Sequence, residues 1–230
     1  MKLSILMPVF NEEARLADAL KEALAVDYPC DVELVVVDDG SRDGTPSILA
    51  GADDPHLRVI THPRNRGKGA AIRTAVDAAE GEYMVILDAD LEYDPNDIPR
   101  LLAPVLDGRA TVVYGNRTFG SHSAYSFWYV MGNKAVTTAA NVLFNSYIGD
   151  LETCFKLMPV QLYRSLEIRS HGFGMEAEVT GKLLRRRIRP FEVPISYTAR
   201  SREEGKKITW RDGVEALWIL GRERGRRVTR

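Results

Sequence analysis

Apolar and polar positions in the first half of the chain form blocks that predict strands and helices in turn. Continuous apolar runs, typical of strands buried on both faces, occupy residues 3–9, 34–37, 57–60 and 83–87. Between these runs, the segments after residue 11, after residue 45 and over 70–79 have patterns that predict helices. Strands separated by helices of this length predict an α/β fold, with a parallel sheet and helices on both faces.

The segment behind the first apolar run carries signals for a helix start. Asn11 is the predicted N-cap, and Glu12 and Glu13 suit a first helical turn, where negative charge is favourable. Leu16 and Leu20 then lie about one turn apart on the predicted apolar face. We therefore expect a helix to begin directly after Asn11.

The second half of the chain is less regular. Its predicted strands are 110–114, 153–158 and 191–197, and its predicted helices are 175–187 and 210–224. Residues 119–148 are rich in aromatic side chains, contain Lys134 as their only Lys or Arg, and predict one or two amphipathic helices. No linker separates these segments, so we expect a single domain over residues 1–230.

Charge and cysteine content narrow the setting of the protein. The formal net charge is −1, which gives no general attraction to nucleic acid. Basic residues concentrate at 182–189 and 221–230, where they are either solvated or face an anionic surface. Cys30 and Cys154 form neither a metal-binding spacing nor a disulfide framework, so a reducing, cytoplasmic setting is expected. No apolar run approaches the ~20 residues of a membrane helix, so any membrane contact is expected to be peripheral.

Polar residues follow three of the predicted strands. Asn11 and Glu12 follow the first strand, Asp39 follows the second, and Asp88 and Asp90 follow the fourth. In open parallel sheets, ligands bind outside the carboxyl ends of the strands. Three strands therefore bring acidic or amide groups to one rim of the sheet.

The segment Asp88-Ala-Asp90 is the clearest candidate for chemistry. In an extended chain, alternate side chains point to the same side, so both carboxylates and Glu92 would lie together. Hard oxygen ligands of this kind suit Mg²⁺ or Mn²⁺, with substrate phosphates completing the coordination. The competing interpretation is that these residues cap a turn and a helix, which is the role we expect for Asp94 before Pro95.

Two further motifs have both a structural and a functional interpretation. Asp39 suits either a turn after a strand or a carboxylate that receives donors from a ribose or a nucleobase. The segment GKG at 67–69 suits either a surface loop or a helix start that brings backbone N–H groups and Lys68 to a phosphate. Its spacing does not match a P-loop, so the sequence does not support a nucleoside-triphosphatase.

These motifs together resemble the family 2 glycosyltransferases, which have the GT-A fold. The resemblance to the family lies in four segments, PVFNE at 8–12, DDGS at 38–41, GKG at 67–69 and DAD at 88–90. The resemblance to the polyprenyl-phosphate (dolichyl-phosphate) sugar synthase branch lies in GNR at 115–117, DLETCFK at 150–156, VPISY at 193–197 and GKKI at 205–208. It implies a nucleotide-sugar-binding half over residues 1–115 and an acceptor-binding half over 116–230.

The resemblance also implies roles for individual residues. The nucleotide-sugar site would comprise Pro8, Phe10, Glu12, Asp39, Lys68 and Asp88. Asp88 and Asp90 would bind the metal and the diphosphate, and Glu92 stands where the branch often has a metal-binding Gln. The acceptor phosphate and the loop that closes over the site would involve Arg117, Lys134, Arg200, Arg202, Lys206 and Lys207. Lys134 is a departure, because related synthases often have Arg in that region.

The implied reaction is an inverting, Mg²⁺- or Mn²⁺-dependent transfer of a hexose or N-acetylhexosamine from a GDP- or UDP-linked donor to a polyprenyl phosphate. Asp90 and Arg117 are the residues we expect to matter most for catalysis. Two alternatives are a family 2 enzyme with a hydroxyl acceptor, in which Glu152 is the general base, and a non-catalytic regulator that binds nucleotide sugars. The aromatic segment and the C-terminal arginines predict peripheral binding at the inner face of the cell membrane. A membrane-protein partner and a homodimer are both compatible with this picture.

Overall fold

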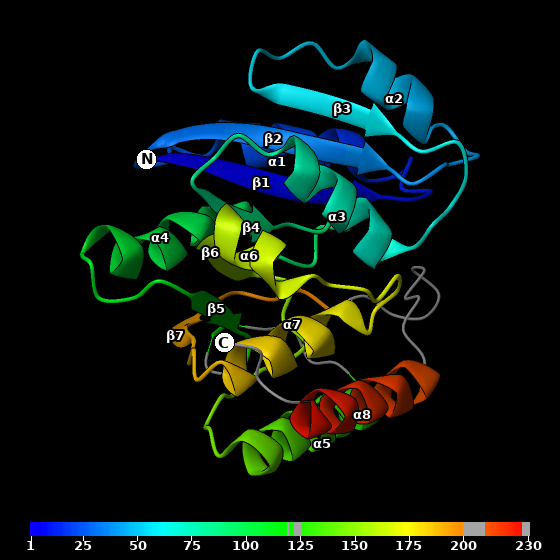
Figure 1. Ribbon diagram of the computed structural model, residues 1–230. Helices are drawn as coiled ribbons and strands as arrows, with labels where there is room; N and C mark the ends of the chain where they lie inside the picture. The colour runs from blue at the N-terminus through cyan, green and yellow to red at the C-terminus, as the bar shows by residue number, and fades with distance from the viewer. Residues whose placement is uncertain (119, 122–125, 200–209, 227–230) are drawn as a thin grey trace.

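The structure is a computed structural model that describes residues 1–118, 120–121, 126–199 and 210–226. Seven strands form one sheet in the order β3-β2-β1-β4-β6-β5-β7 (Figure 1). Their bounds are β1 Lys2–Val9, β2 Asp31–Asp38, β3 Leu57–Thr61, β4 Tyr83–Ile86, β5 Val113–Asn116, β6 Lys156–Pro159 and β7 Phe191–Pro194. Strand β6 pairs antiparallel with β4 and β5, and all other pairs are parallel. The predicted mostly parallel α/β sheet is therefore confirmed.

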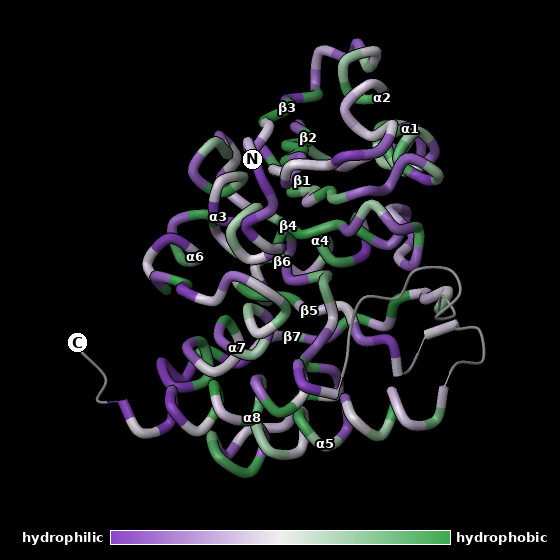
Figure 2. Tube along the Cα trace, turned by 90° about the vertical axis from the view of Figure 1, so that its right-hand side faces the viewer, coloured by the Kyte–Doolittle hydropathy of each residue, from purple (hydrophilic) through white to green (hydrophobic). Residues whose placement is uncertain are grey.

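Helices cover both faces of this sheet. Their bounds are α1 Leu16–Ala25, α2 Thr45–Gly51, α3 Lys68–Ala78, η1 Pro95–Asp97, α4 Ile98–Leu106, α5 Phe127–Phe144, α6 Val160–Leu166, α7 Met175–Arg185 and α8 Trp210–Gly225. Helices α3, α6 and α7 lie on one face, and α1 and α4 lie on the other (Figures 1 and 2). Helices α5 and α8 pack side by side against α7 and form an additional layer.

The sheet core explains the continuous apolar runs of the sequence. In β1, Leu3, Ile5 and Leu6 are at most 1% exposed although successive side chains point to opposite faces. A strand with helices on both sides buries both sets of side chains, so it needs no polar face. Burial of these strands fixes their carboxyl ends at one rim of the sheet.

The connection after β1 differs from the prediction. Helix α1 begins at Leu16, and Asn11 is not its N-cap but has a left-handed backbone with φ of 53°. The backbone N–H of Asn11 donates to Ser41 Oγ (2.9 Å), and Asn11 Oδ1 accepts from the backbone N–H of Arg42 (2.9 Å). Asn11 therefore fixes the loop after β1 against the loop after β2, a contact across 30 residues that local helix signals do not encode.

Helix boundaries elsewhere are close to those predicted. The aromatic segment forms one helix, α5, rather than two, and Asp94 caps η1 by accepting from the backbone N–H of Asn96 (2.8 Å). The short helix α6 was not predicted. None of the described helices combines the length and the apolar character that a membrane crossing needs.

Candidate active site

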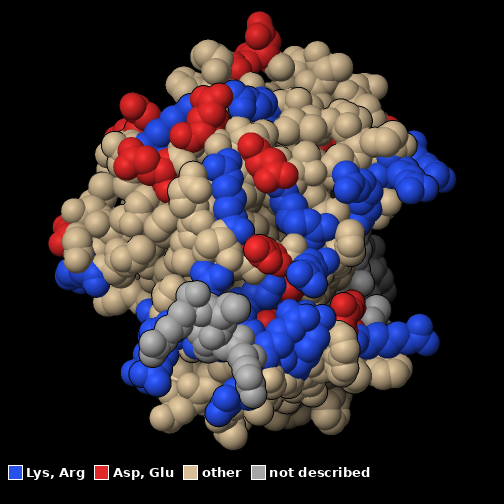
Figure 3. Space-filling view, viewed as in Figure 1, with Lys and Arg blue, Asp and Glu red and all other residues tan. Residues whose placement is uncertain are grey.

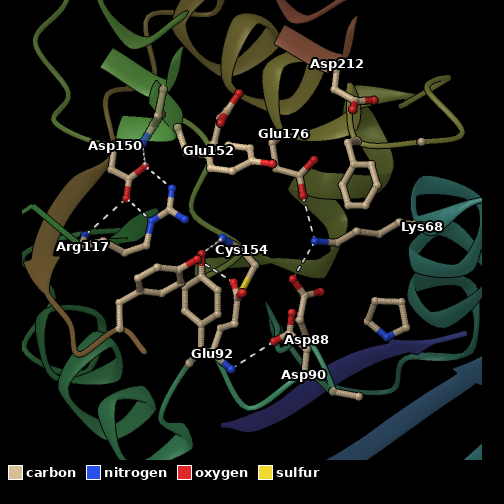
Figure 4. Close-up of a pocket in the computed structure, with 18 of the residues that line it drawn as sticks. Lys68, Asp88, Asp90, Glu92, Arg117, Asp150, Glu152, Cys154, Glu176 and Asp212 are labelled. Atoms are coloured by element: carbon tan, nitrogen blue, oxygen red, sulfur yellow. Dashed lines mark hydrogen bonds and ion pairs between the residues drawn. The ribbon is translucent and has the colours of Figure 1, made fainter. Parts of the chain in front are cut away.

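One pocket of about 620 Å³ opens at the carboxyl ends of β1, β2 and β4. Its volume lies within the range of sites that bind small ligands. Of the residues predicted for the site, those in the described part of the chain all line this pocket: Pro8, Phe10, Glu12, Asp39, Lys68, Asp88, Asp90, Glu92, Arg117, Lys134 and Glu152. Arg200, Arg202, Lys206 and Lys207 lie outside the described residues. Figure 4 shows Asp88, Asp90 and Glu92 on one side of the cavity, with Glu152, Glu176 and Asp212 across from them.

Lys68 joins two sides of the pocket. Its ammonium lies 2.8 Å from Asp88 Oδ2 and 3.0 Å from Glu176 Oε1 (Figure 4). Burial of Lys68 opposes its charged form, but the two carboxylates outweigh burial and raise its pKa well above the usual value. Lys68 is therefore a fixed positive charge next to the first carboxylate of the DAD motif.

Asp90 and Glu92 are arranged by a turn rather than by an extended strand. Strand β4 ends at Ile86, and Leu91 has a left-handed backbone with φ of 60°. Asp90 Oδ1 accepts from the backbone N–H of Glu92 (3.1 Å) and stabilises this turn. The prediction that strand alternation aligns the carboxylates is therefore wrong, although all of them still line the pocket.

Glu92 has a partner that the sequence did not indicate. Its buried carboxylate accepts a hydrogen bond from the Tyr197 hydroxyl (2.5 Å), which brings the end of the β7 segment to the turn after β4. Among the described residues, no three His, Cys, Asp or Glu side chains are grouped as a metal site would require. The role of Glu92 as a third metal ligand stays a prediction.

The pair Asp88 and Asp90 fits a divalent cation without a third carboxylate. Mg²⁺ is usually held by one or two carboxylates together with substrate phosphates and water. The ammonium of Lys68 forms an ion pair with Asp88 and lies beside this donor set. The donor set is made of hard oxygen atoms, as Mg²⁺ and Mn²⁺ prefer.

Asp39 is deeply buried and holds the loop before α3. Its carboxylate accepts from the backbone N–H groups of Arg66 (3.0 Å) and Gly67 (2.7 Å) and contacts His62 Nδ1 at 2.6 Å. His62 was not among the predicted residues, because it lies 23 residues from Asp39 in the sequence and no local pattern links the two. Asp39 lines the pocket and also fixes its wall.

The GKG loop is built differently from the predicted phosphate cradle. The Gly67 N–H is bound by Asp39, and the Gly69 N–H donates to the His171 carbonyl (2.7 Å). A Cβ at Gly67 would approach that carbonyl to 2.4 Å, so the glycine allows close backbone packing. The N–H groups of Gly67 and Gly69 therefore have protein acceptors, and the cation that this loop brings to the pocket is Lys68.

Arg117 is held by a buried carboxylate. Its Nε and Nη2 donate to the two oxygens of Asp150 at 2.6 and 2.8 Å, and Asn133 also donates to Asp150 (2.8 Å). The guanidinium lies over the Tyr197 ring, 5.0 Å from its centroid. Asp150 is thus a structural partner of Arg117, which is one of the two roles that the sequence left open for acidic residues in this segment.

Glu152 is in a different situation. Burial raises the pKa of its carboxyl group, and nearby Arg117 offsets this only in part. Its side chain forms no hydrogen bond or ion pair within the part of the chain that the structure describes. Lys134 is exposed on α5 at the edge of the same pocket.

One buried basic residue, Lys156, was also missed. Lys156 is fully buried and donates to the carbonyls of Leu151 (2.8 Å) and Thr153. Burial lowers its pKa to about 8. Lys156 therefore fixes the loop that carries Asp150 and Glu152. The one signal for this in the sequence is a lysine within an apolar predicted strand.

Solved structures of known proteins share this fold. Glucosyl-3-phosphoglycerate synthase from Mycobacterium tuberculosis, in complex with Mn²⁺, UDP and glucosyl-3-phosphoglycerate, aligns with a TM-score of 0.74. The alignment is 20% identical and covers 99% of this chain and 81% of that one. S. aureus TarS 1–349, in complex with UDP-GlcNAc, aligns with a TM-score of 0.66 at 18% identity, covering 97% and 66%. The fold is that of the GT-A glycosyltransferases.

Sequence comparison then identifies the family. Residues 4–166 match glycosyl transferase family 2, and the chain belongs to this family. It is 37% identical over 153 residues to undecaprenyl-phosphate 4-deoxy-4-formamido-L-arabinose transferase of Pseudomonas fluorescens (strain Pf0-1), covering 63% of this chain and 44% of the relative. It is 36% identical over 108 residues to dodecaprenyl-phosphate galacturonate synthase of Rhizobium johnstonii, covering 45% and 32%. The chain thus spans less than half the length of these relatives.

Proposed function

We propose that the protein transfers a hexose or N-acetylhexosamine from a GDP- or UDP-linked donor to a polyprenyl phosphate, with inversion and with Mg²⁺ or Mn²⁺. The observation that carries the proposal is the gathering of the predicted nucleotide, metal and acceptor residues around one pocket. Two relatives with polyprenyl-phosphate acceptors in their names support the acceptor class. Structural neighbours with Mn²⁺ or Mg²⁺ and UDP support the metal and the donor class.

In the proposed reaction, a phosphate oxygen of the acceptor attacks the anomeric carbon of the donor sugar. The new C–O bond forms as the bond to the nucleoside diphosphate breaks, and the electron pair leaves with the diphosphate. When bound, a divalent cation would supply positive charge that neutralises this leaving group. Asp88 and Asp90 would hold the cation, and Lys68 would add positive charge beside it. Arg117, oriented by Asp150, would align the anionic acceptor.

Release of nucleoside diphosphate tests this proposal directly. GDP-mannose, UDP-glucose and UDP-N-acetylglucosamine would be incubated with Mn²⁺, with and without undecaprenyl phosphate. Turnover that requires the lipid phosphate is the expected result. Turnover with a hydroxyl acceptor in place of the lipid would identify a different branch of the family, and donor binding without any turnover would identify a regulator.

A hydroxyl acceptor is the second candidate, because Glu152 has the properties of a general base. Its raised pKa and the lack of an ion-pair partner among the described residues leave its carboxylate able to accept a proton. An acceptor phosphate is already ionised at neutral pH and needs no such base. The role of Glu152 therefore distinguishes the two acceptors.

We expect the Glu152→Gln enzyme to retain kcat within about threefold of wild type, because loss of a true general base costs about 10²- to 10⁴-fold. The measurement is lipid-dependent nucleoside diphosphate release, with donor binding measured separately. Asp107→Asn, at an exposed position after α4, is the matched control. A folded Glu152→Gln protein that binds donor but has lost turnover would favour the hydroxyl acceptor.

We also propose that α5 and α8 bind an anionic bilayer. Each helix carries an exposed apolar stripe opposite its buried one, with Phe127, Trp128, Met131 and Val142 on α5 and Trp210, Val214, Leu217 and Trp218 on α8. Trp128 is 79% exposed and Trp218 is 63% exposed. Figure 2 shows apolar residues along both helices at the edge of the molecule. Basic residues of α8, such as Arg211 and Arg224, would lie near anionic headgroups.

Flotation with phosphatidylglycerol liposomes tests this surface. The Trp128→Ser/Trp218→Ser protein should show at least about a tenfold weaker partition, because each indole contributes about 1.5–3 kcal/mol when buried in lipid. Leu106→Ser removes an apolar side chain that is 48% exposed on α4, away from both helices, and is the control. Equal partition of the double variant and the control would contradict the proposed membrane face.

A further inference from the structure

A second cavity lies at the far ends of α7 and α8 from the active site. Its volume is about 330 Å³. Its lining residues are Ser165, Leu166, Glu167, Arg169, Lys182, Arg185, Arg186 and Arg226. The two cavities share no lining residue, and the proposed transfer reaction uses none of these side chains.

Helices α7 and α8 connect the two cavities. Glu176 and Asp212, in the first turns of α7 and α8, line the active-site pocket. Arg185, at the end of α7, and Arg226, directly after α8, line the second cavity. Both helices therefore run in the same direction, and the 16 residues of α8 separate the cavities by roughly 20 Å.

The fold brings residues 182–186 of the first basic block close to Arg226 of the second. On the face seen in Figure 3, Lys and Arg outnumber Asp and Glu around α7. Of the eight lining residues that the structure describes, five are basic, one is acidic and one, Leu166, is apolar. Such a lining disfavours an apolar ligand and favours an anion.

The carboxylates near this cavity do not balance its positive charge. Glu223 is completely buried and is shared by Arg226 (2.8 Å), Arg222 (3.1 Å) and Arg185 (3.5 Å).

Glu178 is shared by Lys182 (2.7 Å) and Arg222 (3.7 Å). Burial opposes its ionisation, but hydrogen bonds from Lys182 and from the Ser170 and Arg169 backbone lower its pKa to about 2, so it is ionised. With Arg222, the cluster holds six basic residues against Glu167, Glu178 and Glu223, which leaves a formal charge of 6 − 3 = +3.

Helix capping accounts for only part of this cluster. Lys182 donates to the Leu166 and Glu167 carbonyls (both 2.8 Å), and Arg186 donates to the Ser165 carbonyl (2.6 Å), as cations at helix C-termini do. The Arg169 side chain makes no hydrogen bond or ion pair with any other described residue. The buried Arg185 Nε likewise has no acceptor within the described part of the chain. The Arg169 guanidinium, which is exposed at the cavity, can therefore donate to a ligand with acceptor oxygens.

We propose that this cavity binds a phosphate group. Guanidinium groups match the geometry of phosphate oxygens and form charge-assisted hydrogen bonds with them. The volume equals that of about ten water molecules, so a phosphate with an attached group fits. The group is carried either by a soluble phosphate ester or anion or by the headgroup of an anionic lipid. None of its described lining residues lines the active-site pocket.

Calorimetric titration with inorganic phosphate at constant ionic strength tests the site. We expect saturable binding to the whole chain that Arg169→Gln and Arg186→Gln each weaken by about tenfold, the effect of one lost charge-assisted hydrogen bond. Arg109→Gln removes an exposed arginine whose partner is Asp107 and should leave the affinity unchanged. Both test arginines are exposed, so their substitution should leave the fold intact.

A second arm identifies the source of the phosphate. Co-sedimentation with phosphatidylglycerol vesicles would be measured in the Trp128→Ser/Trp218→Ser background, where insertion of the two indoles is removed. Vesicle binding that Arg169→Gln weakens, without a response to free phosphate, supports a lipid headgroup; the reverse supports a soluble phosphate. If neither Arg169→Gln nor Arg186→Gln changes either titration, the phosphate site does not exist.

Discussion

Asp90→Ala should lower lipid-dependent sugar transfer by about three orders of magnitude or more while the protein remains folded. The proposed reaction places charge on a nucleoside diphosphate, and loss of a carboxylate that holds the neutralising cation removes that stabilisation. In the structure, Asp90 Oδ1 also accepts from the Glu92 backbone N–H, a contact worth about 1 kcal/mol of stability. The measurements are steady-state nucleoside diphosphate release over a Mn²⁺ titration and thermal unfolding.

Asp94→Ala is the matched control for this experiment. Asp94 lies four residues further along the same acidic segment but caps η1 through the Asn96 N–H, and its loss should cost about 1 kcal/mol of stability. Its turnover should stay near that of wild type, because it does not line the pocket. An Asp90→Ala enzyme with more than a tenth of wild-type turnover would rule out the proposed catalytic role of Asp90.

The sequence predicted the strands better than the way they are connected. Continuous apolar runs identify β1 to β4 because strands buried on both faces need no polar side. The antiparallel direction of β6 and the extra helix α6 depend on how the second half returns to the sheet, which no local periodicity encodes. The same limit explains why Asn11 was predicted as an N-cap: its side chain instead accepts a hydrogen bond from the loop after another strand, β2.

The candidate site shows the same division. Residues that belong to short motifs, such as Asp39 and Asp88, were found from their position at strand ends and from the family resemblance. The partners of Asp39, Lys68 and Glu92 were missed, because these contacts form only in the folded chain. The partners are His62, Glu176 and Tyr197 respectively. The sequence offered one signal for Glu176, because it is an acidic residue in the first turn of a predicted helix. Acidic residues are common there in any case, since they interact favourably with the helix dipole.

Arg117→Met should separate folding from function when it is combined with a change at Asp150. Removal of the guanidinium leaves Asp150, whose side chain is 1% exposed, as a buried charge without its cation, and this should cost about 3–5 kcal/mol of stability. Arg117→Met/Asp150→Leu replaces the pair by apolar side chains and should recover most of that loss. Neither variant should recover transfer, because Arg117 is the proposed contact with the acceptor phosphate.

The pH dependence of unfolding provides an independent measure of the same pair. Burial favours the protonated form of Asp150, but Arg117 and Asn133 outweigh burial, so the pKa of the carboxyl group lies below its usual value of 3.8. A carboxyl group whose pKa is lowered by folding stabilises the protein above that usual value and loses this contribution as the pH falls below it. Between about pH 5 and pH 2, the free energy of unfolding of wild type should therefore fall more than that of the double variant, when both are measured in the same buffers. Equal acid sensitivity would contradict the ion pair, and restored transfer in the double variant would show that Arg117 serves the fold rather than the acceptor.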